Sequence, residues 1–137
     1  MKLGIPDDSV PVQEMFEGFF AEESSPARVR AAEPLGFDAA LWRELVATEA
    51  PFMRLSADAG GGGMSLFDCC LMMEQAGRRL ASAPLAEAVV ALRMLGELGG
   101  DIAKQWIDKV RDGETVLTLA LHPVKAGVSQ LVPGAAM

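Results

Sequence analysis

The sequence is poor in the residues that build metal sites and disulfides. Its 137 residues contain one histidine, His122, and two cysteines, the neighbours Cys69 and Cys70. One histidine without clustered cysteines or carboxylates cannot complete a zinc site. Successive side chains on a helix point about 100° apart, which is a poor geometry for a bridge between adjacent cysteines. We therefore predict no metal site and no disulfide framework, and the latter favours a reducing, cytoplasmic compartment.

Basic residues are also scarce. Lysine and arginine number 12 against 19 aspartates and glutamates, which gives a formal net charge of −7. Nucleic acids and anionic lipid surfaces are bound through clustered basic side chains, so we predict neither as a partner. We see no basic start followed by a long apolar run, and no charge-free apolar stretch approaches the roughly 20 residues of a membrane-spanning helix. We expect a soluble domain with no secretory signal and no membrane contact.

Apolar residues make up 50% of the chain, enough to bury a sizeable core within one domain. They recur at steps of three and four over most of the length, which predicts a mainly α fold of five to six helices. The predicted helices span residues 9–23, 39–48, 65–82, 85–95 and 102–111, with a partly helical stretch at 27–36.

Three details of these helices can be predicted. Ser65 and Asp68 have the spacing of a capping box, and Glu74 and Arg78 that of an i,i+4 ion pair. Both cysteines are expected to be core thiols. The long helix at 65–82 is expected to be the most buried, with its inner face formed by Leu66, Phe67, Cys70, Leu71, Met73, Ala76 and Leu80. The inner face of the last helix is expected to be Ile102, Trp106 and Val110.

The periodicity changes near Glu114. Residues 115–121 read TVLTLAL, an apolar alternation that predicts a strand, and a second short strand is predicted at 128–132. We therefore divide the chain into a helical domain at 1–113 and the truncated start of a β-domain at 114–137. One or two isolated strands are marginally stable without partners, so the rest of such a sheet would lie elsewhere.

Four consecutive glycines, Gly60–Gly63, must form a loop. A glycine run before a helix could cradle phosphate, but no apolar strand precedes it and no Lys-Ser/Thr pair follows it. A flexible connector is the favoured interpretation.

Four segments in this order resemble the amino-terminal helical domain of the acyl-CoA dehydrogenase family. They are GFDAALWRELVATEAP at 36–51, AGGGGMSLFDCCLMMEQAGRRLASAPL at 59–85, GGDIAKQWIDKVRDGE at 99–114, and TVLTLAL, which stands where the family's middle β-domain begins. Together the matches extend over about residues 10–121. Each segment alone is a weak signal, and the order and spacing of all four carry the resemblance.

The resemblance implies that the full-length protein oxidises an acyl-CoA thioester to the 2-enoyl-CoA and passes a hydride to FAD, with the helical domain helping to wall the acyl-chain and flavin site. The family's catalytic glutamate lies in a later helical domain, so no catalytic residue is nominated and the fragment alone is expected to be inactive. Assembly into homo- or hetero-oligomers is expected. The candidate substrate-binding residues are Ala83, Leu85, Ala86, Val89 and Val90. Ordinary helix packing is the alternative role for these small and branched side chains.

The flavin motif of the family is weakened here. Where members carry Thr-Glu-Pro, this chain reads Leu121-His122-Pro123, and Leu121 lacks the hydroxyl that would donate to the flavin. Leu121 and His122 are the candidate cofactor-binding positions, with a surface turn as the alternative for His122. The departure suggests a divergent member that pairs with a flavin-carrying partner. A non-catalytic helical partner subunit or interaction module therefore remains the alternative function.

Overall fold

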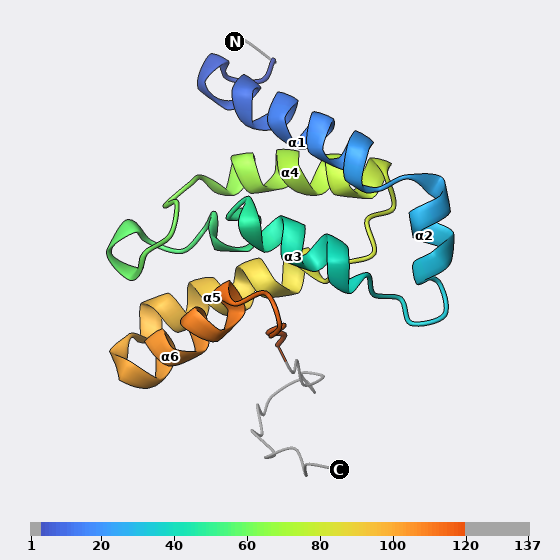
Figure 1. Cartoon of the computed structure of the whole chain (residues 1–137). Helices are drawn as coiled ribbons and strands as arrows, with labels where there is room; N and C mark the ends of the chain where they lie inside the picture. The colour runs from blue at the N-terminus through green and yellow to red at the C-terminus, as the bar shows by residue number, and fades with distance from the viewer. Residues whose placement is uncertain (1–3, 120–137) are drawn as a thin grey trace, which may run out of the picture.

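The computed structural model describes residues 4–119, which form six α-helices and three short 3-10 turns (Figure 1). The helices are α1 (Val10–Glu23), α2 (Pro26–Ala32), α3 (Ala39–Ala47), α4 (Leu66–Arg78), α5 (Leu85–Leu98) and α6 (Gly100–Arg111). The 3-10 turns are η1 (Asp7–Ser9), η2 (Ala50–Phe52) and η3 (Ala57–Ala59). The predicted mainly α fold is confirmed.

Helix α3 lies between two layers of the bundle. Figure 1 shows α1 and α4 side by side on one side of α3, and the α5–α6 hairpin on the other. Leu41 and Leu45 of α3 belong to the core that α1 and α4 complete. Trp42 and Val46 belong to a second core, which is completed by α5 and α6. Because both faces of α3 are covered, its inward side chains are at most 6% exposed.

Polar side chains cap the first turns of two of the helices. Ser65 accepts a hydrogen bond from the Asp68 N–H while the Asp68 carboxylate accepts one from the Ser65 N–H, so the capping box is confirmed. Asp38 caps α3 by accepting from the N–H groups of Ala40 and Leu41. These caps fix where α3 and α4 leave their preceding loops.

Helix α5 is longer than the predicted range of 85–95. It continues through Gly96 to Leu98 and ends at Gly99, which has φ +65°. A Cβ at position 96 would clash with the Leu55 side chain. Gly96 therefore allows close packing of η2 and its following residues on α5, rather than terminating the helix.

The predicted inner face of α4 is only partly correct: Leu71 is buried, Met73 and Ala76 are partly buried against the core, and the other four positions are exposed. Its buried residues are Cys69, Leu71, Met72 and Gln75, and the helix ends at Arg78 rather than near residue 82. The outward positions are instead Leu66, Phe67, Cys70 and Leu80. Apolar residues occur around most of this helix, so periodicity alone could not choose the face. The packing of α1 against α4 selects it.

The predicted face of α6 is also only partly correct: Val110 is buried as predicted, but the other two positions are each displaced by one residue. Ala103, Ile107 and Val110 point inward, whereas Ile102 is 74% exposed and Trp106 38%. The Lys109 ammonium lies 4.2 Å from the Trp106 ring centroid, a cation–π contact that partly covers the indole.

The segment after α6 does not form the predicted strand over its described part. Gly113, with φ +75°, turns the chain away from α6. Residues 115–119 have no regular secondary structure, and no strand occurs between residues 4 and 119. A strand is defined by hydrogen bonds to a neighbour, and the described part of the chain provides none. Residues 120 and 121 and the predicted strand at 128–132 lie outside the described residues, and the domain division near Glu114 stays a prediction.

Candidate functional site

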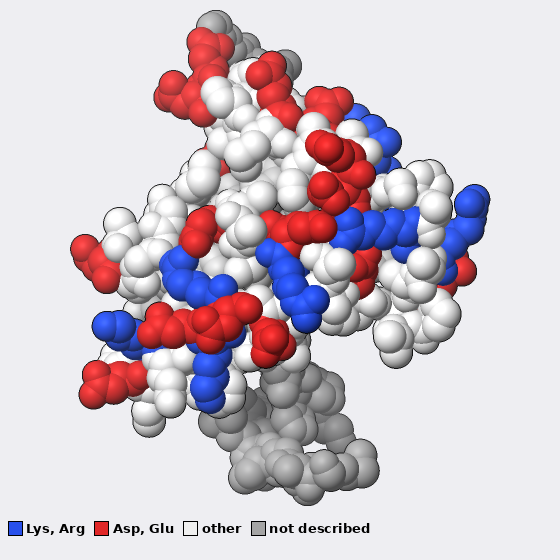
Figure 2. Space-filling model, viewed as in Figure 1, with Lys and Arg blue, Asp and Glu red and all other residues white. Residues whose placement is uncertain are grey.

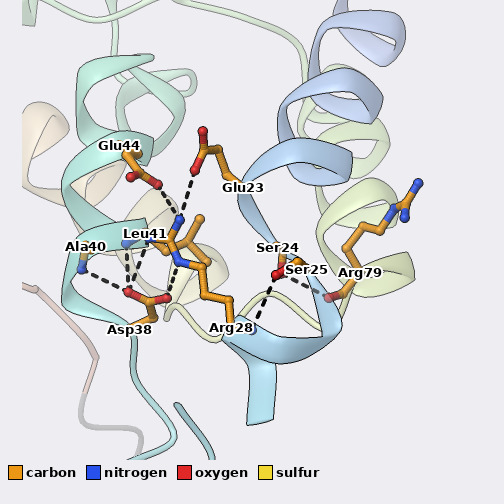
Figure 3. Close-up of polar contacts among 9 residues, drawn as sticks. All are labelled: Glu23, Ser24, Ser25, Arg28, Asp38, Ala40, Leu41, Glu44 and Arg79. Carbon is orange, nitrogen blue, oxygen red and sulfur yellow. Dashed lines mark hydrogen bonds and ion pairs between the residues drawn. The ribbon is translucent and has the colours of Figure 1, made fainter. Parts of the chain in front are cut away.

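Arg28 of α2 is the centre of an ion-pair network that joins three helices (Figure 3). Its Nε lies 2.5 Å from Asp38 Oδ2, and its Nη1 lies 2.9 Å from Glu23 Oε2 and 3.0 Å from Glu44 Oε2. The hydrogen bond to Asp38 raises the pKa of Arg28 and lowers the pKa of Asp38. Arg28 and Asp38 therefore stay charged at neutral pH, and the network holds the α2–α3 connection against the ends of α1 and α3.

The α2–α3 connection faces the linker between α4 and α5. The Asp38 N–H donates a hydrogen bond of 2.8 Å to the Ser82 carbonyl and so joins the two segments. Next to this bond is a hollow of about 560 Å³. Its walls are Gly36 and Phe37, the linker residues Ala81, Ser82, Ala83 and Pro84, and Glu87 and Val116. Since only Ser82 and Glu87 contribute polar side chains, the hollow suits an apolar group better than an anion.

The five candidate substrate-binding residues do not share one wall. Ala83 lines the hollow. Leu85 and Val89 are buried in the core with α1 and α4, at 3% and 5% exposure. Ala86 and Val90 lie on the exposed side of α5. The exposed pair follows the buried pair by one residue in the sequence, and one residue corresponds to a rotation of about 100° around a helix.

Several residues of the hollow were missed from the sequence. Phe37 precedes the N-cap of α3 and Glu87 lies in the first turn of α5, positions that periodicity assigns to no face. Val116 follows α6 in the sequence, and only the tertiary fold brings it to the same hollow as Phe37. The candidate cofactor positions Leu121 and His122 lie outside the described residues.

The glycine-rich loop is held by backbone hydrogen bonds. The N–H groups of Gly61, Gly62 and Gly63 donate to the carbonyls of Ser56, Phe52 and Leu55 at 2.9, 3.1 and 2.8 Å. The N–H groups of Gly60 and Met64 donate to the carbonyls of Ala57 and Met53. A phosphate cradle needs free N–H groups, so that interpretation is excluded. The expectation of a flexible connector did not include these bonds, which tie the loop to η2 and η3.

The cysteines differ from each other. Cys69 is buried, and burial raises the pKa of its thiol to about 11, which disfavours the reactive thiolate. Cys70 is exposed, so the expectation of two core thiols is wrong for one of them. Within residues 4–119, no group of three or more His, Cys, Asp or Glu side chains is placed to hold a metal ion. No helix in the same stretch has the length and apolar character needed to cross a membrane.

The family model "Acyl-CoA dehydrogenase, N-terminal domain" matches residues 6–114. Acyl-CoA dehydrogenase IpdE2 of Mycobacterium tuberculosis is 29% identical over 122 residues, 86% of this chain and 38% of that protein. Benzylmalonyl-CoA dehydrogenase of Aromatoleum aromaticum is 26% identical over 131 residues, 93% of this chain and 35% of that protein. The chain thus spans little more than a third of the length of these curated relatives. No solved structure is significantly similar.

The family match begins before α1 and ends just after α6, so it covers all six helices and the residues from Gly36 to Glu87 that surround most of the hollow. The chain belongs to the acyl-CoA dehydrogenase family and contains that family's N-terminal domain.

Proposed function

We propose that this chain is the N-terminal domain of an FAD-dependent acyl-CoA dehydrogenase that oxidises an acyl-CoA thioester to the 2-enoyl-CoA. The domain's role is to wall part of the acyl-chain site. Family membership and the two relatives support the reaction class, because both relatives are named as dehydrogenases of a CoA ester. The activity belongs to the whole protein, and we assign none of its chemical steps to this domain.

The observation that carries the acyl-chain role is the hollow beside the α4–α5 linker. Ala83 is a candidate substrate-binding residue from the sequence, and it lines this hollow together with Phe37, Pro84 and Val116. Binding of an acyl chain against such an apolar wall is favoured by roughly 0.8 kcal/mol for each methylene that is removed from water. The small side chain at position 83 leaves the space open.

The described residues of the hollow do not fit FAD. Its pyrophosphate would need cationic side chains or free backbone N–H groups. The hollow offers no cation, and its one ionisable side chain, Glu87, is an acid that would repel the cofactor. We therefore assign these residues to the acyl chain alone. Leu121 and His122 remain candidates for the cofactor.

The test is the substitution Ala83→Phe in the full-length protein, which would fill the hollow. Oxidation of acyl-CoA substrates of increasing chain length, or with a bulky ring, is followed with an artificial electron acceptor. We expect KM to rise about tenfold for the long or bulky substrates and to change little for the shortest. The matched control is Ala21→Phe, which adds the same ring at an exposed position of α1.

An unchanged chain-length profile in the Ala83→Phe protein would contradict the assigned wall. A full-length protein that binds no flavin and oxidises none of the substrates would contradict the enzymatic proposal itself and support the non-catalytic partner subunit. Absorbance in the flavin bands, measured on the purified protein, separates these two results.

A further inference from the structure

A second hollow, of about 280 Å³, lies between α2 and the end of α4. Three arginines line it: Arg30 from α2, and Arg78 and Arg79 from the end of α4. The one acidic side chain in its lining is Glu33. This excess of positive charge runs against the chain as a whole, which carries a formal net charge of −7. On the face shown in Figure 2, acidic side chains gather over α1.

The guanidinium groups around this hollow are largely free to bind. Arg30 and Arg79 form no ion pair with any residue of the described chain. Arg78 donates to Glu74 Oε1 from Nε and Nη2, at 3.1 and 2.7 Å, and keeps its Nη1 unused in these bonds. Figure 3 shows the Arg79 side chain directed away from the Arg28 network, so the acids of that network do not neutralise it.

The backbone that carries Arg79 is fixed in place. Ser24 is 3% exposed, and its hydroxyl donates a hydrogen bond of 3.0 Å to the Arg79 carbonyl, which ties the end of α4 to the start of α2. Leu80 then has φ +53°, a conformation that residues other than glycine rarely adopt. The fold thus holds arginines that are about 50 residues apart in the sequence around one hollow.

We propose that Arg30, Arg78 and Arg79 form a binding site for a phosphoryl anion. The planar guanidinium matches the geometry of phosphate oxygens and donates to them through charge-assisted hydrogen bonds. Arginines near the carbonyl end of a helix also interact favourably with its dipole. That effect accounts for Arg78 and Arg79 at the end of α4 and for Arg30 in the last turn of α2. It does not account for the meeting of both helix ends at one hollow. The proposal concerns a different hollow from the acyl-chain wall and does not rest on the proposed reaction.

The test is calorimetric titration of the 137-residue chain with inorganic pyrophosphate at low ionic strength. We expect saturable binding that weakens as salt is added. The double variant Arg30→Gln/Arg79→Gln should lower the affinity at least about tenfold. The double variant Arg43→Gln/Arg93→Gln changes the net charge equally, at sites outside this hollow, and should bind as the parent chain does. Circular dichroism melting of each variant identifies any that fails to fold, and single substitutions then replace it.

Two further ligands identify the source of the phosphate. Coenzyme A carries phosphates and pantetheine carries none. Arginine-dependent binding of coenzyme A but not of pantetheine assigns the site to the nucleotide end of a CoA ester. Arginine-dependent binding of pyrophosphate alone assigns it to a free phosphate. The proposal is overturned if no phosphorylated ligand binds, or if both double variants lose the same affinity.

Discussion

Two loops of this domain differ in how far their residues are available to a ligand, and the difference is the opposite of what their glycine content suggests. The loop before α4 contains four consecutive glycines, yet its N–H groups from Gly60 to Met64 are all bonded to backbone carbonyls. The linker between α4 and α5 contains one proline and no glycine, yet its residues border two hollows. One is lined by Phe37 and Ala83, and the other, the arginine hollow, is lined by Arg30, Arg78 and Arg79. Glycine content reports which backbone conformations are possible, and the hydrogen bonds decide which groups remain available to a ligand.

The largest expected effect is on the glycine-rich loop. A Cβ at position 61 would overlap the backbone of Leu55, which cannot move aside as a flexible side chain could. We expect Gly61→Ala to lower the free energy of unfolding by about 3 kcal/mol, the upper end of the usual cost of overpacking. Urea denaturation measures the change. A loss below about 0.5 kcal/mol, the usual range for surface sites, would mean that the loop is loosely packed and that the contrast with the linker is wrong.

The next effect concerns the support of the linker. In Arg28→Met, the carboxylates of Asp38, Glu23 and Glu44 lose their shared cation, and the α2–α3 connection that bonds to Ser82 loses its anchor. Arg28 is 24% exposed and Asp38 13%, so solvent screens the pairs only in part. We expect Arg28→Met to lower the free energy of unfolding, measured by urea denaturation, by about 1–2 kcal/mol. Arg93→Met, which removes the more exposed pair with Glu97, should cost less than half as much.

The same network predicts an acid dependence. The pKa of Asp38 is lowered in the folded chain, chiefly by the hydrogen bond from Arg28. The ionised form is therefore favoured by folding, and its contribution is present above the unfolded pKa of about 3.9 and is lost as pH falls through the folded value. Unfolding in urea at pH 7 and pH 3 measures this loss. The loss should be smaller in Arg28→Met than in the parent chain, and equal losses would show that the pair does not determine the pKa.

The sequence predicts interactions between residues that are close in the chain better than interactions between residues that are far apart in it. The Ser65–Asp68 capping box is a local interaction, and the spacing of its two residues predicted it. The bonds of Gly61–Gly63 reach back only to residues 52–56, but nothing in the side chains encodes a backbone bond. The inner faces of α4 and α6 were predicted only in part: Leu71 and Val110 are buried, but apolar residues extend around each helix beyond the face that packing covers. The arginine hollow combines residues from α2 and α4, so only the tertiary fold brings its members together.

A smaller effect tests how the glycine-rich loop is tied to the end of the domain. Arg111 of α6 donates to both Glu49 oxygens, at 2.5 and 2.7 Å, and to the Gly60 carbonyl. Its guanidinium also lies 4.2 Å from the Phe52 ring centroid. We expect Arg111→Met to cost about 1 kcal/mol, because these groups are partly exposed. Hydrogen exchange at Gly60–Met64 should accelerate in this variant, while exchange in α4 stays unchanged. Equal acceleration in both would indicate global destabilisation instead.

The smallest effect separates a glycine that the fold requires from one that it does not. Gly77 lies in the last turn of α4, and an added Cβ there would meet no atom within 4 Å. Alanine is the better helix former, so we expect Gly77→Ala to stabilise the chain by about 0.5 kcal/mol, opposite in sign to Gly61→Ala. Urea denaturation of the two variants side by side makes the comparison. Destabilisation by Gly77→Ala would show that the end of α4, and hence the linker that follows it, is as tightly constrained as the glycine-rich loop. The difference between the two loops would then lie in their side chains alone.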